Sequence, residues 1–115
     1  MTHFENERFA QLFERWDELK QQIEASNGPS TAYIVEGIVL FKELLALGGT
    51  SSETPTTEVV FDENEARHYV LLPLNGIERL NYIESSMKHR HAFIQLDALF
   101  IETKKRVARL RVMNK

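Results

Sequence analysis

A chain of 115 residues, with 43% hydrophobic and 27% charged residues and a formal net charge of −3, has the composition of a single soluble globular domain. The absence of cysteine excludes disulfides, thiolate metal ligands and a cysteine nucleophile. The N-terminal residues MTHFENERF are acidic and polar, unlike a secretory or transit signal, so a cytoplasmic protein is expected. The most apolar run, at 33–49, contains three charged residues, which favours a buried helix over a membrane span and predicts no membrane association.

The first helix is expected to begin at Thr2, because Thr2 and Glu5 have the spacing of a capping box. Beyond them, hydrophobic residues recur at alternating steps of three and four, a helical pattern that ends at Asn27-Gly28-Pro29. The buried face that this pattern predicts consists of Phe9, Leu12, Phe13, Trp16, Leu19 and Ile23.

A second helix is expected to follow, capped by Ser30 or Thr31 and ending at Gly48-Gly49. It has hydrophobic residues on most of its sides. A helix of this kind is surrounded by other helices, so we predict that it is the central one. Its principal face consists of Ile34, Ile38, Phe41 and Leu45.

The polar stretch at 50–58 contains a proline and has no periodicity, which predicts a flexible loop. Residues 59–61 are too few to establish a sheet and are expected to tuck under the bundle as an extended plug. The spacing of Asp62 and Glu65 then predicts a short helix. Asn75 is expected to cap one more short helix.

The last helix is expected to run from about Ser86 to Val112. A seam at steps of three and four lies on one side of it, within about 80° of arc at 100° per residue. His89 falls on the same side, whereas His91 lies about 200° away, so a regular helix cannot direct both imidazoles to one metal ion. We therefore expect His89 beneath the core and His91 in solvent. The seam consists of Phe93, Leu96, Phe100, Thr103, Val107 and Leu110.

One alternative function is a metal-binding or hydrolytic enzyme built around Glu65, His68 and His89. The first two have an ExxH spacing, which stacks a carboxylate and an imidazole on one helical face, and di-iron bundles use this motif twice. Here the motif occurs once, so a surface pair is the favoured interpretation. Serines at 85 and 86 are more typical of a helix cap than of Ser-His catalysis. We predict no catalytic residues, no metal site and no cofactor.

Charge is the one asymmetric feature of the sequence. Residues 88–115 carry eight Lys/Arg and two acids, whereas residues 1–87 carry six Lys/Arg and fifteen acids. A basic helix can lie against acidic neighbours in its own bundle. The functional alternative is a binding surface for an acidic protein partner, with Lys105, Arg106 and Arg109, which point away from the seam, as candidate residues. Weak nucleic-acid binding is a further alternative, which the negative overall charge and the lack of interleaved aromatic residues disfavour.

A second hydrophobic line on the last helix consists of Ile94, Ile101 and Ala108, displaced by about 100 to 120° from the seam. Either two neighbours within the bundle flank this helix or a second subunit covers the line. We predict a homodimer with these three residues at its interface.

One more pattern lies in residues 71–102, LPLNGIERLNYIESSMKHRHAFIQLDALFIE, and consists of Pro73, Asn75, Glu78, Arg79, Leu80, Ile83, His91, Phe93, Gln95, Leu96, Leu99 and Phe100. It resembles the C-terminal part of the YpoC-like proteins, small proteins of Gram-positive bacteria. The resemblance implies a bacterial, cytoplasmic, helical protein and brings no established activity. It singles out Asn75, Arg79 and Gln95 as polar residues within the pattern. Asn75 is already expected to be an N-cap, and we expect Arg79 and Gln95 to tie the short helices to the long one.

Together these patterns predict an all-α protein, a single domain over 1–115 built as a small bundle of about four or five helices with a long C-terminal helix. We expect a non-enzymatic module for protein–protein interaction. Its expected partner is an acidic protein.

Overall fold

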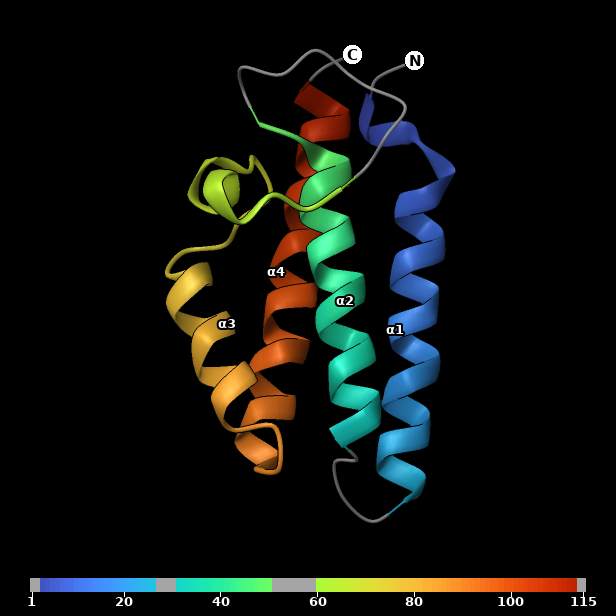
Figure 1. The fold of residues 1–115 in the computed structure, drawn as a ribbon. Helices are drawn as coiled ribbons and strands as arrows, with labels where there is room; N and C mark the ends of the chain where they lie inside the picture. The colour runs from blue at the N-terminus through green and yellow to red at the C-terminus, as the bar shows by residue number, and fades with distance from the viewer. Residues whose placement is uncertain (1–2, 27–30, 51–59, 114–115) are drawn as a thin grey trace.

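The computed structural model describes residues 3–26, 31–50 and 60–113, and these form an antiparallel bundle measuring 42 × 26 × 23 Å (Figure 1). The prediction of an all-α bundle with a long C-terminal helix is confirmed. Apart from an isolated bridge, the described residues form no β-structure, and none of their helices has the length and apolarity to cross a bilayer. The elements are η1 (His3–Glu5), α1 (Glu7–Ala25), α2 (Thr31–Gly48), η2 (Glu63–His68), α3 (Gly76–Ser85) and α4 (Arg90–Met113).

The start of α1 differs from the prediction. Its N-cap is Asn6, whose side-chain oxygen accepts a hydrogen bond of 2.9 Å from the Arg8 N–H, whereas Thr2 lies outside the described residues. The reason is Phe4, which is buried against Phe9 with ring centroids 5.9 Å apart, so η1 turns the chain into the core before α1 begins. The predicted buried face of α1 is confirmed, because all six of its residues are at most 9% exposed.

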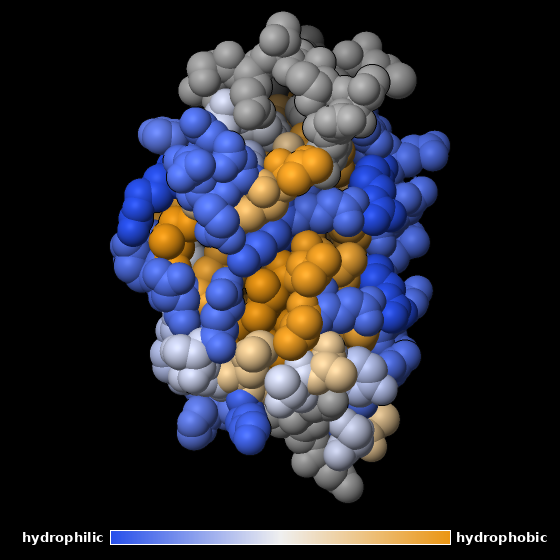
Figure 2. Space-filling model, in the orientation of Figure 1, coloured by the Kyte–Doolittle hydropathy of each residue, from blue (hydrophilic) through white to orange (hydrophobic). Residues whose placement is uncertain are grey.

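The bounds of α2 agree with the prediction, and it packs against α1, α3 and α4. It lies close to α1 at Gly37, where a Cβ atom would lie 2.5 Å from Trp16 Cζ3. Its central place among the helices is as predicted, but its outer side is open, with Val35 44% and Val39 59% exposed, so other helices do not surround it on every side. Figure 2 shows a hydrophobic patch in the middle of this face of the molecule.

Trp16 lies at the centre of the core. Its ring stacks on Phe100 of α4, with centroids 4.6 Å apart and planes inclined by 11°, and Phe41 of α2 meets Phe100 edge-on at 5.3 Å. The indole Nε1 donates a hydrogen bond of 3.0 Å to Asp97 Oδ1, which satisfies the polar group of a side chain that is 2% exposed. One aromatic cluster therefore joins α1, α2 and α4.

The connection between α2 and α3 only partly follows the prediction. Of the predicted loop at 50–58, all but Thr50 lies outside the described residues, and Thr50 is buried and bridged to Tyr69. Of the predicted plug, Phe61 stacks on Tyr69 with centroids 5.3 Å apart, whereas Val60 is 75% exposed. Of the two described plug residues, Phe61 is therefore the one that packs against the core.

The two predicted caps after this connection behave differently. Asp62 accepts a hydrogen bond of 2.9 Å from the Asn64 N–H and begins η2, as predicted, although η2 is a 3-10 helix. Asn75 is the N-cap residue of α3, as predicted, but its side chain makes no cap hydrogen bond. Its backbone is left-handed, with φ of 56°, a conformation that Asn tolerates better than most residues, and it forms the turn into α3.

The start of α4 is Arg90, four residues later than predicted. A turn precedes it, in which the His89 N–H donates a hydrogen bond of 2.9 Å to the Ser86 carbonyl. The prediction that His89 lies beneath the core is wrong: His89 is exposed, because regular helical geometry does not extend to it. His91 is exposed, as predicted. The predicted seam is confirmed, with Leu110 partly buried and the other five residues buried.

Candidate interaction surface

The lysines and arginines of the acidic part of the chain form ion pairs within the bundle. Each of the six lysines and arginines before residue 88 has a carboxylate oxygen within 4 Å: Arg8 pairs with Glu43, Arg15 with Glu36, Lys20 with Asp97, Lys42 with Glu63 and Glu84, Arg67 with Glu78, and Arg79 with Glu102. Most of these pairs join two different helices. They also neutralise Asp97 and Glu102, the two acids of the basic C-terminal segment.

The cations of α4 are arranged differently. Lys104 places its ammonium 5.8 Å from the centroid of the Phe13 ring, and Arg111 Nε donates a hydrogen bond of 2.6 Å to the Phe4 carbonyl. Lys105, Arg106 and Arg109 are exposed, and none of the carboxylates in the described ranges forms an ion pair with them. We call these three residues the basic face. Glu102 attracts Lys105 electrostatically, but it does not form an ion pair with it.

A hydrophobic line runs beside the basic face on the outer side of α4. Ile94 and Ile101 are 48% and 45% exposed, and Ala108 is exposed too, so the described part of the chain leaves the line open. Partly buried Ala98 and 71% exposed Val112 extend it. Once Lys105 is included, the residues of the line are spaced alternately four and three positions apart in the sequence. We call this line the outer seam; it consists of Ile94, Ala98, Ile101, Lys105, Ala108 and Val112.

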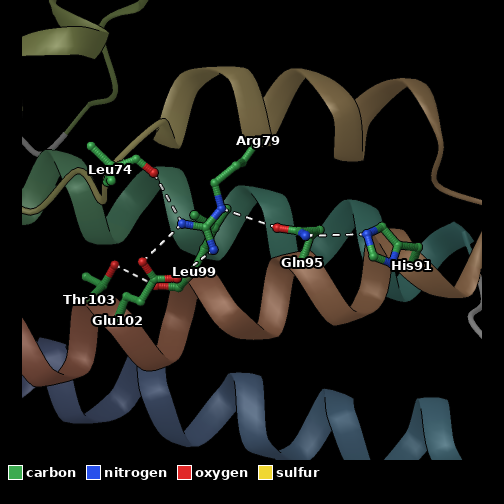
Figure 3. A network of polar contacts seen from close by, with 7 residues as sticks. All are labelled: Leu74, Arg79, His91, Gln95, Leu99, Glu102 and Thr103. Carbon is green, nitrogen blue, oxygen red and sulfur yellow. Dashed lines mark hydrogen bonds and ion pairs between the residues drawn. The ribbon is translucent and has the colours of Figure 1, made fainter.

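Arg79 fastens α3 to α4. Its guanidinium donates hydrogen bonds of 3.0 and 2.5 Å to the two carboxylate oxygens of Glu102, one of 3.3 Å to Gln95 Oε1 and one of 3.3 Å to the Leu74 carbonyl (Figure 3). Gln95 Nε2 in turn lies 3.4 Å from His91 Nε2. The guanidinium holds the pKa of Glu102 below its ordinary value. Arg79 and Gln95 therefore join the short helix to the long one, as expected.

Replacing Arg79 by Met is expected to lower the free energy of unfolding by about 1 kcal/mol at neutral pH, because it removes charge-assisted hydrogen bonds that solvent partly screens. The pKa of Glu102 is lowered from 4.5 on folding, so the stabilisation is fully present above that value and is lost as the pH falls through the lower folded-state pKa. The difference in melting temperature between wild type and variant should therefore shrink as the pH is lowered to about 3.

Arg67→Met is the matched control for this prediction. It removes the ion pair with Glu78, whose partners have side chains 65% and 57% exposed, and is expected to change the free energy of unfolding by less than about 0.5 kcal/mol. If the Arg79→Met difference were the same at pH 7 and at about pH 3, the loss would come from packing of the Arg79 stem and not from its charge.

The residues of the predicted enzymatic alternative are not brought together. His68 Nδ1 lies 3.3 Å from Glu65 Oε2, but the two side chains are 70% and 43% exposed. His89 follows the far end of α3, whose ten residues span about 15 Å (Figure 1). The described ranges contain no group of three His, Asp or Glu placed to hold a metal ion. Ser85 Oγ donates to the Tyr82 carbonyl at 3.0 Å, within its own helix end.

A hollow of about 430 Å³ lies between η2, α2 and α3. Its lining includes Phe61 and Leu80, and its charged groups take part in ion pairs. Lys42 reaches both Glu63 and Glu84, at 3.3 and 3.2 Å, and places its ammonium 5.3 Å from the Phe61 ring centroid. Since its central cation already has two partners, the hollow is a poorer candidate than the open surface of α4.

The comparison with known proteins identifies the family. A family model described as YpoC-like protein matches residues 6–115. The chain belongs to the YpoC-like family. It is similar to a Bacillus subtilis (strain 168) protein named Uncharacterized protein YpoC, with 30% identity over 109 residues, a match that covers 90% of this chain and 65% of that relative. No solved structure matches. The resemblance first noted at 71–102 is confirmed and extends over nearly the whole chain.

Sequence reasoning found only part of the surface of this YpoC-like chain. It found the basic face and three residues of the outer seam, and it missed Ala98 and Val112, although steps of four and three could have located them. It also missed that Asp97 and Glu102 are neutralised. Their partners lie on α1 and α3, so no local pattern in the sequence of α4 could show it.

Proposed function

We propose that this YpoC-like protein is a non-enzymatic interaction module that binds an acidic protein partner through the basic face. The observation that supports the proposal is the difference in ion pairing between two sets of cations. The six cations before residue 88 are all used within the bundle, whereas Lys105, Arg106 and Arg109 are exposed and without a carboxylate partner in the described ranges. The proposal includes a cytoplasmic location.

The electrostatics of α4 fit this role. Exposed cations that hold no internal partner lose little when they bind an outside carboxylate, and they speed association by steering the partner. The two acids of α4 are held by Lys20 and Arg79, so they oppose the field of the basic face only weakly. An acidic protein is a better match than nucleic acid, because the chain is negative overall and the described part of α4 exposes no Phe, Tyr or Trp.

The test is a charge reversal with a matched control. Lys105→Glu combined with Arg109→Glu should abolish capture of acidic proteins from a nuclease-treated lysate of the native host. Lys88→Glu combined with Arg90→Glu makes the same change in net charge at the other end of α4 and should leave capture unchanged. Both variants should stay folded, since surface changes usually cost within about 0.5 kcal/mol each. Melting curves by circular dichroism check this point.

Three outcomes would contradict the proposal. Equal loss of capture in both variants would show that net charge alone controls binding. Loss of capture by the wild type after nuclease treatment would point to nucleic acid, and such binding would also weaken steeply with salt. Unfolding of the Lys105→Glu, Arg109→Glu variant would show that these cations are structural partners of the bundle.

A further inference from the structure

We infer that the outer seam seats an amphipathic helix of the partner, one that carries carboxylates beside its apolar stripe. This inference rests on the proposed function and adds to it the form of the partner's binding element. The occupant is identified by the spacing of the outer seam, by the size of its side chains and by the charges on either side of it.

The spacing of the outer seam suits a helix. Its residues follow one another at steps of four and three from Ile94 to Val112, about 27 Å of α4, which is the pattern by which one helix packs along another. Ala98 and Ala108 are small and let a second backbone approach closely, while Ile94 and Ile101 supply apolar contacts. Lys105, the one polar member, can lay its stem along the apolar line and keep its ammonium at the edge.

The charges beside the outer seam select the occupant. Arg106 and Arg109 flank its C-terminal half and are exposed, whereas Asp97 and Glu102 are already held by Lys20 and Arg79. A helix that docks here therefore meets free cations and neutralised acids. Carboxylates on that helix would be attracted, and lysines or arginines at the same places would be repelled.

A second copy of this chain matches the surface less well. The described residues of α4 carry six Lys/Arg and two acids, so a dimer built on the outer seam would place two strongly basic helices face to face. A second copy of this chain, as in the predicted homodimer through Ile94, Ile101 and Ala108, is thus the alternative occupant of the outer seam. The two occupants can be distinguished by sedimentation.

The groove on the other side of α4 sets the orientation of the docked helix. This groove, of about 240 Å³, lies between α1 and α4 next to Ala108, and its lining includes Glu14 and Asp17 of α1 as well as Lys104 and Arg111 of α4. The two carboxylates offset the two cations, so this side attracts an acidic helix less than Arg106 and Arg109 do. The partner is therefore expected to lie toward Arg106 and Arg109 and away from α1.

The experiment uses a synthetic helical peptide of about 20 residues, with leucines at steps of three and four and glutamates beside them. The full-length protein should bind it, and binding should be lost with a peptide in which lysines replace the glutamates. Ile94→Ser combined with Ile101→Ser should weaken binding at least about tenfold, about 1.4 kcal/mol. Val35→Ser combined with Val39→Ser, at residues of similar exposure on α2, is the matched control and should change nothing.

The outcomes separate the inference from the proposed function. If an acidic peptide with its leucines scrambled binds equally well, charge alone is recognised; the inference fails and the proposed function stands. If Lys105→Glu combined with Arg109→Glu leaves peptide binding unchanged, the basic face is not the binding surface and the proposed function fails. If no acidic peptide binds, the inference fails. If the wild type sediments as a dimer that Ile101→Glu converts to a folded monomer, the occupant is a second copy and the inference also fails.

Discussion

Replacing Trp16 by Ala is expected to lower the free energy of unfolding by about 3 to 5 kcal/mol, a large share of the roughly 5 to 15 kcal/mol that stabilise a domain. The substitution removes the stacked contact with Phe100 and leaves a cavity where three helices meet. Gly37 cannot fill that space, because it has no side chain and its backbone already lies against the indole ring. Urea unfolding followed by circular dichroism measures the loss.

Two further variants separate the causes of this loss. Trp16→Phe keeps a stacked ring but removes the hydrogen bond to Asp97, so a smaller loss of about 1 to 2 kcal/mol is expected. Val39→Ala shortens a side chain that is 59% exposed and should change stability by less than about 0.5 kcal/mol. A Trp16→Ala variant as stable as Val39→Ala would show that the aromatic cluster is not the centre of the core.

The faces of the helices were predictable from the sequence because they depend on local periodicity. Apolar side chains at steps of three and four lie on one side of a helix wherever it is placed in the bundle, and the buried residues of α1 and the seam of α4 follow this rule. Because α2 has hydrophobic residues on most of its sides, its sequence does not show which side is exposed. It could not show that Val35 and Val39 face solvent.

The starts of the helices were less predictable, because they depend on a few specific contacts and not on periodicity. Burial of Phe4 against Phe9, together with the hydrogen bond from Arg111 to the Phe4 carbonyl, forces the turn before α1. His89 was misplaced because a short turn after Ser86 holds it outside α4. The contact with Arg111 leaves no signal near the start of α1, and the turn before α4, although local, has no periodicity that distinguishes it from a first helical turn.

The candidate surface, too, was predictable from the sequence only in part. The excess of cations in the last helix is visible in the composition, and the positions of Lys105, Arg106 and Arg109 away from the core follow from helical geometry. Whether those cations form ion pairs depends on tertiary structure, because it depends on which acids of α1 and α3 lie next to α4. In the described ranges, none of these acids lies within ion-pair distance of the basic face.

Two adjacent residues of α4 are expected to differ most in how much stability an introduced carboxylate costs. Val107→Asp would place a carboxylate at a position that is 2% exposed and should cost about 3 kcal/mol or more. Ala108→Asp adds the same charge one residue later, where the side chain is exposed, and should cost less than about 0.5 kcal/mol. Comparison of their melting curves with that of the wild type tests the assignment of the two faces of α4.

The pH dependence shows how the new carboxylate at 107 is accommodated. If it stays buried and unpaired, its pKa rises on folding, and acidification should recover part of the lost stability by neutralising it. Lys104 and Arg111 line the same groove, but they are engaged with the Phe13 ring and the Phe4 carbonyl. If they abandoned those contacts to pair with the carboxylate, its pKa would fall and acidification would destabilise the variant further. We expect recovery, because pairing would undo the contacts that hold η1 and α1 against α4.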